Sequence, residues 1–416
     1  MSTDTDRAYE VYQRQTEADL PVTIPPGFSV QPEFVDDPYP TLALLQQHYP
    51  CFRDWGTNSW WVTRYDDVTS LIADDASFEA RPRRSLYGRA IGGTDLREEP
   101  RVRAAIGRIM QEDAERVAAD ALAEFMNADH RDVVAGYVRS FSDGLLARIL
   151  GVAAADGSRF GELVRTVHEG IGWHPGREDG GVRAAVALRQ LCDEAISQKR
   201  TEPGDDVLSA VLVWQEGASD TELSEHVVAT LVELDLETLE GSIANLLFLL
   251  LDHRDQLSLV LEDIELVRRG WQETMRHSPP VADSHRYSVR EVERFGQLIP
   301  RGALVTCSAA AANRDPRIFD EPNRFWMERT DLAYREARGQ FRTDGLASAV
   351  APGLLPLSKL PVLPADRPPS FYALTERCAT VAAQTLLDGV RGLRIGRSEV
   401  PALSARWPGD LRTCRR

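Results

Sequence analysis

Hydrophobic residues recur at helical spacing through the central part of the chain, from about residue 97 to residue 280. Ser224 is expected to cap the start of the longest of the predicted helices, in which Gly241 is a weak breaker. The predicted helices span 103–125, 133–150, 183–198 and 221–251. This part of the chain therefore indicates a large helical body.

The flanking regions show strand and loop patterns. Ser59–Thr63 is rich in β-formers, Asp66–Ile72 has an Asp-led helix start, and Ala303–Ser308 is a short apolar strand. The β-rich parts lie near 55–65 and 285–310, a Pro-rich loop spans 345–370, and a last helix spans 372–387. We therefore predict a mainly α fold with a minor β portion, in which an extended N-terminal segment (1–36) precedes a single domain (37–416).

Composition narrows the function classes. The 416 residues carry a net charge of −16, which argues against nucleic acid or an anionic membrane as a partner. The N-terminus has no signal-peptide pattern, and the apolar run Leu246–Leu251 is too short to span a bilayer, so we expect a cytoplasmic protein. The five cysteines are scattered, which favours free thiols over a metal site. They are Cys51, Cys192, Cys307, Cys378 and Cys414.

Four segments, in this order along the chain, resemble the bacterial cytochrome P450 family. A strand-to-helix segment at 61–68 is followed by the ExxR motif at Glu273–Arg276. Ile299–Gly302 then matches IPxG, and 311–316 reads AANRDP before Phe319, Pro322 and Phe325. An isolated ExxR is common by chance, but this series at the family's spacing is specific. The resemblance covers about residues 37–395 and implies the cytochrome P450 fold.

The resemblance also implies structural roles. Glu273 and Arg276 lie three residues apart, so they share a helix face and can form a charge-assisted pair. In the family this pair ties its helix to the loop that here contains Asn313, Arg314 and Asp315, and to the region of Arg329. These residues are expected to hold the fold and to perform no chemistry.

The cysteine loop with which the family holds haem iron is not recognisable in this sequence. Alignment through the last helix places the ligand position near Pro369, in the Pro-rich loop. Cys378 lies about nine residues later, inside the predicted helix, and reaching the iron would shift that helix by more than two turns.

Two further haem contacts are altered. The small pair of the family's central helix is replaced by Leu234 and Asp235, although Glu237 and Thr238 match its acid–alcohol pair. In the HxxxR clamp for a haem propionate, Arg103 is kept but Glu99 replaces the histidine, and its charge would repel a propionate. Arg286 matches the family's other propionate-binding arginine. Together these changes predict no cofactor, with haem bound only if its ligation is atypical.

Acidic residues of the central helix suggest residual chemistry. Glu233, Glu237 and Glu240 are expected on one helix face, either as a solvated stripe or as the lining of an empty pocket. In the second case Asp235, Glu237 and Thr238 would be the catalytic residues, because buried carboxylates can act as general acids or bases. His285 and Arg286 would be their partners. His168 is expected to have a loop or core role, and no metal motif is present.

Three hypotheses follow. The sequence favours a haem-free P450 homologue of actinobacterial-type secondary metabolism that helps a partner enzyme, such as a deoxysugar glycosyltransferase. The second is an enzyme that uses the empty pocket for a small-molecule ligand and non-redox chemistry such as dehydration, cyclisation or isomerisation. The third is a haem monooxygenase with atypical ligation. The absorption spectrum of the purified protein separates the third hypothesis from the other two.

Overall fold

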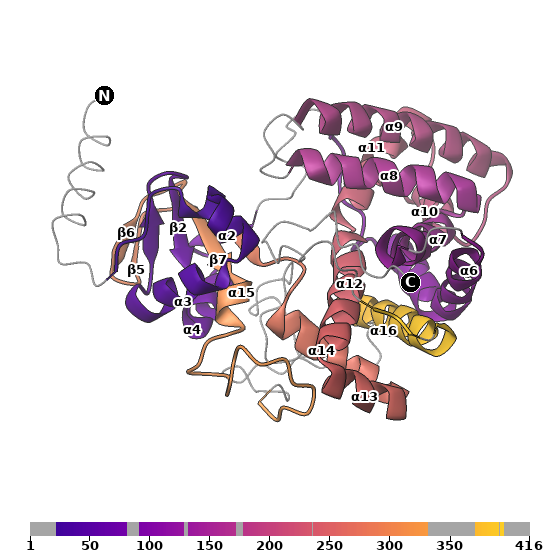
Figure 1. The fold of residues 1–416 in the computed structure, drawn as a ribbon. Coiled ribbons are helices and arrows are strands. Elements are labelled where there is room, and N and C mark those ends of the chain that lie inside the picture. The colour runs from indigo at the N-terminus through magenta and orange to yellow at the C-terminus, as the bar shows by residue number, and fades with distance from the viewer. Residues whose placement is uncertain are drawn as a thin grey trace.

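The structure is a computed structural model, and it describes residues 22–80, 91–128, 132–171, 178–234, 236–331, 371–390 and 392–394. Its described part is mainly helical with a small sheet, in agreement with the sequence (Figure 1). No helix in these ranges is both long and apolar enough to cross a membrane. The 345–370 loop, the extended segment 1–21 and Asp235 lie outside the described residues.

A five-stranded sheet joins the N-terminal part of the chain to a segment more than 200 residues later, and its strand order is β1-β2-β7-β4-β3. The parallel pair β2–β7 lies at its centre, and the other pairs are antiparallel. A separate hairpin pairs β5 with β6. The strands are β1 Phe52–Asp54, β2 Ser59–Val62, β3 Phe78–Glu79, β4 Asp283–Ser288, β5 Val292–Arg294, β6 Gln297–Ile299 and β7 Leu304–Ser308.

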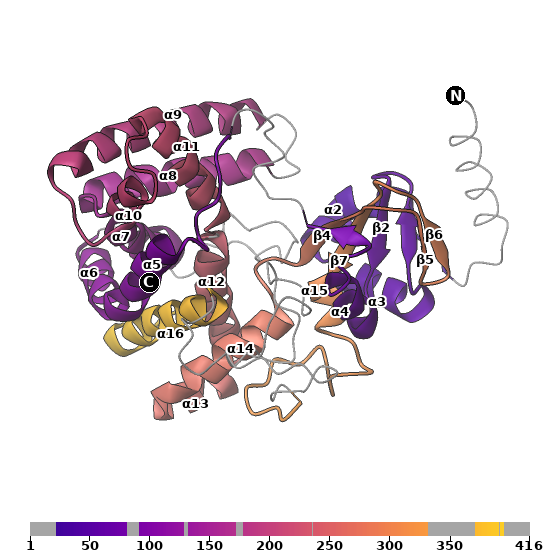
Figure 2. The same ribbon diagram turned by 180° about the vertical axis from the view of Figure 1, so that it is seen from behind.

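Short helices pack beside this sheet and complete what we call the sheet lobe, residues 22–80 and 282–312 (Figures 1 and 2). Residues 28–36, predicted to be extended, instead form a 3-10 turn and a helix, for which Pro32 supplies a favourable first position. Phe28 and Phe34 are buried against Trp61 of β2, which explains why this segment is ordered. The helices are α2 Pro32–Asp36, α3 Tyr39–His48, α4 Tyr65–Ile72 and α15 Ala309–Ala312.

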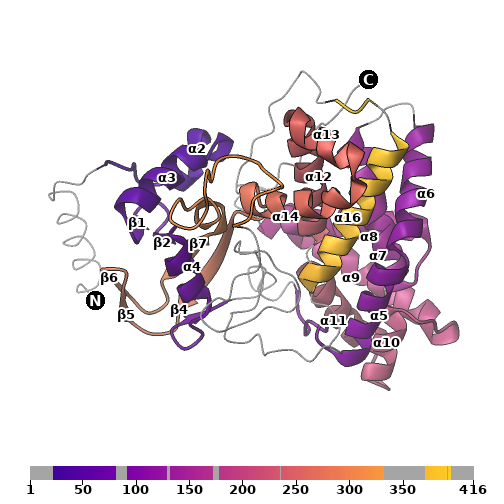
Figure 3. The same cartoon turned by 90° about the horizontal axis from the view of Figure 1, so that it is seen from below.

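The remaining helices form a helical lobe, residues 91–277 and 371–394 (Figure 3). The helix predicted at 103–125 is two helices in the structure, which meet at Asp113, and the one predicted at 221–251 is also two. The helices are α5 Pro100–Glu112, α6 Ala114–Asn127, α7 Arg139–Leu150, α8 Ala154–Ile171, α9 Glu178–Thr201, α10 Val207–Trp214, α11 Asp220–Glu233, α12 Leu236–Asp252, α13 Arg254–Glu262, α14 Val267–His277 and α16 Phe371–Gly389.

Helix α12 lies on the side of the helical lobe that faces the sheet lobe (Figure 1). Its C-terminal half carries the apolar run Leu246–Leu251, of which all but Phe248 is buried. Helix α16 packs across α6, α12 and α14, and the Tyr137 hydroxyl donates a 2.7 Å hydrogen bond to the carbonyl of Ala382 in α16. The apolar run of α12 is typical of a helix buried in a large core.

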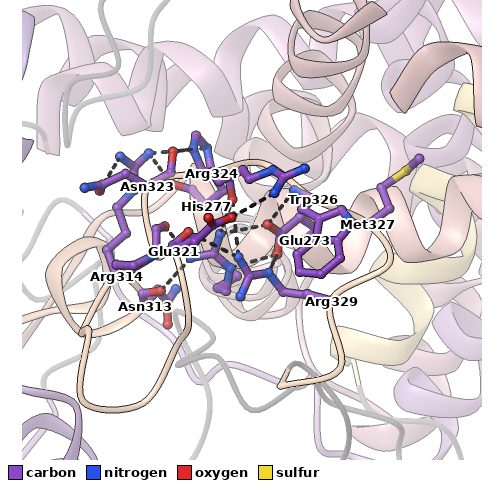
Figure 4. Close-up of polar contacts among 12 residues, drawn as sticks. Glu273, His277, Asn313, Arg314, Glu321, Asn323, Arg324, Trp326, Met327 and Arg329 are labelled. Carbon is purple, nitrogen blue, oxygen red and sulfur yellow. Dashed lines mark hydrogen bonds and ion pairs between the residues drawn. The ribbon is translucent and has the colours of Figure 1, made fainter. Parts of the chain in front are cut away.

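A buried ion cluster joins α14 to the chain that follows the sheet (Figure 4). Glu273 pairs with Arg276 through two contacts of 2.7 Å and with Arg329 at 3.0 Å, and all three side chains are at most 1% exposed. The backbone N–H of Trp326 donates to the same carboxylate. Arg276 also donates to the backbone carbonyls of Asn313, Pro322 and Arg324. One carboxylate and one guanidinium therefore fix the course of residues 313–329.

The AANRDP segment supplies the other half of this connection. Asn313 donates from its amide to the carbonyl of Met275 in α14. Arg314 donates to the carbonyl of His277, and its guanidinium stacks 3.3 Å from the centre of the Tyr39 ring. Asp315 accepts from the backbone N–H of Tyr65 at the start of α4. The segment thus links α14 of the helical lobe to α3 and α4 of the sheet lobe.

We predict that Glu273→Gln destabilises the protein by about 3–5 kcal/mol, because it leaves the buried Arg276 guanidinium without a carboxylate and leaves Arg329 with Asp331 alone. The matched control is Glu321→Gln, which removes the exposed pair with Arg324 and should cost less than about 1 kcal/mol. Urea unfolding followed by circular dichroism measures both variants. Equal effects of the two substitutions would contradict the importance assigned to the buried cluster.

A second prediction concerns Asp283, which pairs with Ser308 in the register of β4 and β7. Burial raises its pKa to about 7, although a hydrogen bond with the Ser308 side chain opposes this. Because the folded-state pKa lies above the unfolded value, this carboxyl contributes stability that is lost as the pH rises from about 4 through 7.

Asp283→Asn should therefore gain stability relative to the wild type as the pH is raised from 5 to 8. Urea unfolding of both proteins at the two pH values measures this difference. A difference in stability that does not change with pH would show that Asp283 has an ordinary pKa.

Candidate functional site

The long central helix is broken where the sequence carries Leu234 and Asp235. Helix α11 ends at Glu233, Leu234 is its C-terminal cap, and α12 begins at Leu236. The prediction of one uninterrupted helix was wrong, because apolar periodicity continues through the break and does not reveal it. The predicted cap was also wrong: Ser219 caps α11 in a capping box with Glu222, while Ser224 lies within the helix.

The break separates the carboxylates that were expected to share one face. Glu233 ends α11, where it lies 3.9 Å from Arg97, whereas Glu237 and Glu240 lie on α12. Glu237 and Thr238 are in the first turn of α12. The face predicted for all three glutamates therefore does not exist, but Glu237 and Glu240 still lie three residues apart on one side of α12.

His168 of α8 contacts both sides of the break. Its Nε2 lies 2.7 Å from the carbonyl oxygen of Val232 in α11, and its Nδ1 lies 3.2 Å from Glu237 Oε1 in α12. The His168 ring is buried, in keeping with the core role expected from the sequence. No local pattern indicated the contact with Glu237, because His168 and Glu237 are 69 residues apart along the chain.

A second group of charges lies one turn further along α12. Arg165 of α8 bridges Glu240, at 2.8 Å, and Asp143 of α7, at 2.9 Å. Burial raises the pKa of both carboxyl groups, and the nearby Arg165 opposes this. Gly161 permits the close approach, because a Cβ there would lie 1.9 Å from the Asp143 carboxylate. Asp143 and Arg165 were missed by the sequence reasoning, since no local motif marks them.

Strand β4 carries the candidate residues of the sheet lobe. Arg286 is 7% exposed, and its guanidinium donates to the backbone carbonyl of His285. Burial and the charge of Arg286 lower the pKa of His285, so this imidazole is neutral at pH 7. Among the described residues no carboxylate is paired with Arg286. The structure thus places His285 and Arg286 in the sheet lobe and Glu237 and Thr238 in the helical lobe, and their joint action stays a prediction.

The remaining residues of the predicted propionate clamp lie at the start of α5. Glu99 is the N-cap of this helix and accepts hydrogen bonds from the backbone N–H groups of Arg101 and Val102. Arg103 pairs with Glu98 at 2.9 Å and lies 4.8 Å from the centre of the Phe371 ring. Glu99 therefore caps the N-terminus of α5, and Arg103 pairs with the nearby Glu98.

The described residues could bind a haem propionate, but they do not include a suitable cysteine ligand for the haem iron. Arg286 is a buried guanidinium without a carboxylate partner in the described ranges, which suits a propionate. The four described cysteines are buried, and desolvation raises the pKa of each, which disfavours the thiolate form that iron requires. Cys378 lies inside α16, where its Sγ donates to the carbonyl of Met110. Pro369 and Cys414 lie outside the described residues.

Two hollows appear in the described part, and neither is lined by α12 or β4. One of about 740 Å³ lies between α5, α6 and α7, and one of about 450 Å³ lies between α3 and the segment 311–323. No group of three or more histidine, cysteine, aspartate or glutamate side chains in these ranges is arranged to hold a metal ion. The candidate site therefore rests on the two sides just described, the α11–α12 break and β4.

Known proteins resemble this chain over most of its length. The sequence model of the family "Cytochrome P450" matches residues 250–338. The 6-deoxyerythronolide B hydroxylase of Saccharopolyspora erythraea is 27% identical over 70% of this chain and 80% of its own length. The nocardicin C N-oxygenase of Nocardia uniformis is 27% identical over 69% and 78%. The crystal structure of CalO2 is 25% identical, covers 91% of this chain and 95% of its own, and has a TM-score of 0.69.

These relatives correct the functional prediction. Their names describe a hydroxylase and an N-oxygenase, which favours a haem monooxygenase. The expected haem-free helper of a partner enzyme, the non-redox pocket enzyme and the absence of a cofactor are therefore contradicted. The sequence reasoning went wrong because it gave the missing loop and the two altered haem contacts more weight than Arg286 and the Glu237–Thr238 pair, which remained.

The predicted fold class is confirmed by the same comparison, since a helix-rich chain with a minor sheet superposes on a solved structure across nine-tenths of its length. The Glu273–Arg276 pair and the AANRDP segment lie within residues 250–338, the part that the family model matches. This chain is similar to the cytochrome P450 family in sequence and in fold.

Proposed function

We propose that this protein is a haem-dependent oxygenase of secondary metabolism, located in the cytoplasm, that acts on a small-molecule substrate. The observation that carries the proposal is Arg286, whose buried guanidinium has no carboxylate partner in the described ranges. Burying an uncompensated cation is costly, so its retention favours an anionic ligand at β4. The hydroxylase and N-oxygenase among the relatives support the choice of haem as that ligand and of oxygenation as the reaction.

The chain's own residues have separate roles in this proposal. Arg286 would bind a propionate through charge-assisted hydrogen bonds and so orient the cofactor. Bound haem would supply the activation of dioxygen. Glu237 and Thr238, in the first turn of α12, would hold a proton beside it. Because Glu237 is 22% exposed, its carboxyl group can exchange that proton with solvent.

We further propose that the protein is a divergent member of the family that lacks the cysteine loop. The segment 332–370, where the alignment places that loop, contains no cysteine and no histidine. Cys378 is held as a thiol in α16, and burial raises its pKa to about 12. In this proposal a group other than a cysteine thiolate would bind the haem iron.

Titration of the purified protein with haem tests this proposal. We predict that a Soret band develops with one haem per chain and without the carbon monoxide shift typical of thiolate ligation. Cys378→Ser should leave the spectrum unchanged. The absence of a Soret band at saturating haem would contradict the proposed function. A thiolate-type spectrum that is lost in Cys378→Ser would overturn the proposed iron ligand.

Arg286→Gln should weaken haem binding about tenfold or more, since a hydrogen bond to a charged group contributes about 1.5–3 kcal/mol. Arg290→Gln is the matched control, because Arg290 is an exposed arginine next to the same strand and contacts Ser77. Haem dissociation constants from the same titration measure both variants. Equal affinities of Arg286→Gln and wild type would place the cofactor elsewhere.

A further inference from the structure

We infer that the hollow beside α3 is a binding site for a small organic carboxylate, which Arg314 and Arg317 hold by its charged end. This space, which we call the α3 hollow, has a volume of about 450 Å³ and lies between α3 and the segment 311–323. Sites for small molecules commonly have volumes of about 300–1,000 Å³. Neither β4 nor α12 lines the α3 hollow, so the inference goes beyond the proposed function and does not depend on haem.

The charged side chains in the wall of the α3 hollow are basic. Arg314 and Arg317 belong to this wall, and the described residues that line it include no aspartate and no glutamate. This composition contrasts with the net charge of −16 of the whole chain. A recess whose lining carries charge of one sign raises the local concentration of ions of the opposite sign. The lining therefore favours an anion.

Arg314 retains hydrogen-bonding capacity on the side of the hollow. Its Nε and Nη2 donate to the carbonyl oxygen of His277, at 3.0 and 2.7 Å. Among the described residues its Nη1 has only a 3.4 Å contact, with the side-chain oxygen of Asn323 (Figure 4). Nη1 carries two N–H groups, and 3.4 Å is long for a hydrogen bond from a charged donor. Because Asn323 also lines the hollow, Nη1 is placed to donate to a bound carboxylate.

The charge of Arg314 is only partly balanced by its neighbours. Within the described ranges no carboxylate forms an ion pair with it. Burial lowers the pKa of Arg314, whereas Asp37 and Glu273 attract the cation from farther away, and Glu273 is already paired within the buried ion cluster. A guanidinium group nevertheless stays charged at neutral pH. A bound anion would therefore offset part of the cost of burying this charge.

Arg317 offers a second donor to the same space. Its Nε and Nη2 each bind the Asp315 carboxylate at 2.7 Å, so this ion pair orients the guanidinium and leaves Nη1 available. Asp315 accepts at the same time from the backbone N–H of Tyr65 and does not line the hollow. A carboxylate in the α3 hollow can therefore accept hydrogen bonds from two guanidinium groups.

The remaining lining indicates the class of anion. Much of it is apolar and comes from Leu42, Ala43, Ala311, Pro316 and Pro322. The prolines have no backbone N–H, and phosphate sites rely on groups of this kind. Apolar walls beside two guanidinium groups suit a molecule with a carboxylate at one end and an apolar body that packs against α3. A carboxylate thus fits the hollow better than inorganic phosphate does.

Sodium benzoate is the probe for this site, with benzamide as its neutral analogue and inorganic phosphate as the competing anion. NMR titrations of the purified, ¹⁵N-labelled chain at constant ionic strength measure each affinity from the shifts of α3 and of the segment 311–323. We expect saturable binding of one benzoate per chain and at least about tenfold weaker binding of benzamide and phosphate. Equal affinities for benzoate and benzamide, or tighter binding of phosphate, would overturn the assignment.

Substitutions on α3 test the position of the site. Ala43→Glu adds volume and a negative charge to the hollow from an exposed position, and should weaken benzoate binding about tenfold or more. Leu44→Glu is the matched control, because this neighbouring exposed residue does not line the hollow, and its effect should stay within about twofold. Equal affinities of Ala43→Glu and Leu44→Glu would place the benzoate elsewhere, whatever the effect of substituting Arg314 on folding.

Arg286→Gln separates this site from the proposed cofactor site. Arg286 is also a buried arginine without a carboxylate partner in the described ranges, so benzoate bound at β4 must be told apart from benzoate in the α3 hollow. The inference predicts that Arg286→Gln leaves benzoate affinity unchanged. Loss of benzoate binding in Arg286→Gln but not in Ala43→Glu would overturn it. Failure of the haem titration would contradict the proposed function alone, and the absence of saturable benzoate binding would contradict this inference alone.

Discussion

A single buried carboxylate, that of Glu273, faces two guanidinium groups and one backbone N–H, and the relation between the two lobes depends on it. Arg276 uses its remaining donors on three carbonyl groups of the segment 313–329. Buried charges of this kind are costly unless they are fully paired. In this cluster the buried charges are paired, and their contacts hold the segment 313–329 against α14.

The same principle explains the interior of the helical lobe. Helices α11 and α12 are separated by the break at Leu234, and His168 of α8 contacts residues on both sides of it. His168 takes up a carbonyl of α11, and Arg165 neutralises Glu240. The glutamates expected to form a solvated stripe or a catalytic row thus differ in role. Glu237 is partly exposed, whereas Glu240 is buried and structural.

Much of the fold could be predicted from the sequence because its signals are local. The spacing of Glu273 and Arg276, the AANRDP segment and the apolar periodicity all lie within short stretches of chain. The α11–α12 break was missed because Leu234 continues the apolar pattern, and the Arg165–Glu240 contact was missed because it depends on how distant helices pack. The cofactor was predicted wrongly because the missing cysteine loop and the two altered haem contacts outweighed Arg286. Only the structure reveals that its guanidinium is buried with no carboxylate partner among the described residues.

We propose that this chain binds haem at Arg286 with an iron ligand other than cysteine. Diffraction at the iron absorption edge from crystals grown with haem tests it most directly. The expected result is one iron peak per chain between β4 and the first turn of α12, with no sulfur atom bound to the iron. Crystals without an iron peak, or with iron bound to the sulfur of Cys378, would contradict the account.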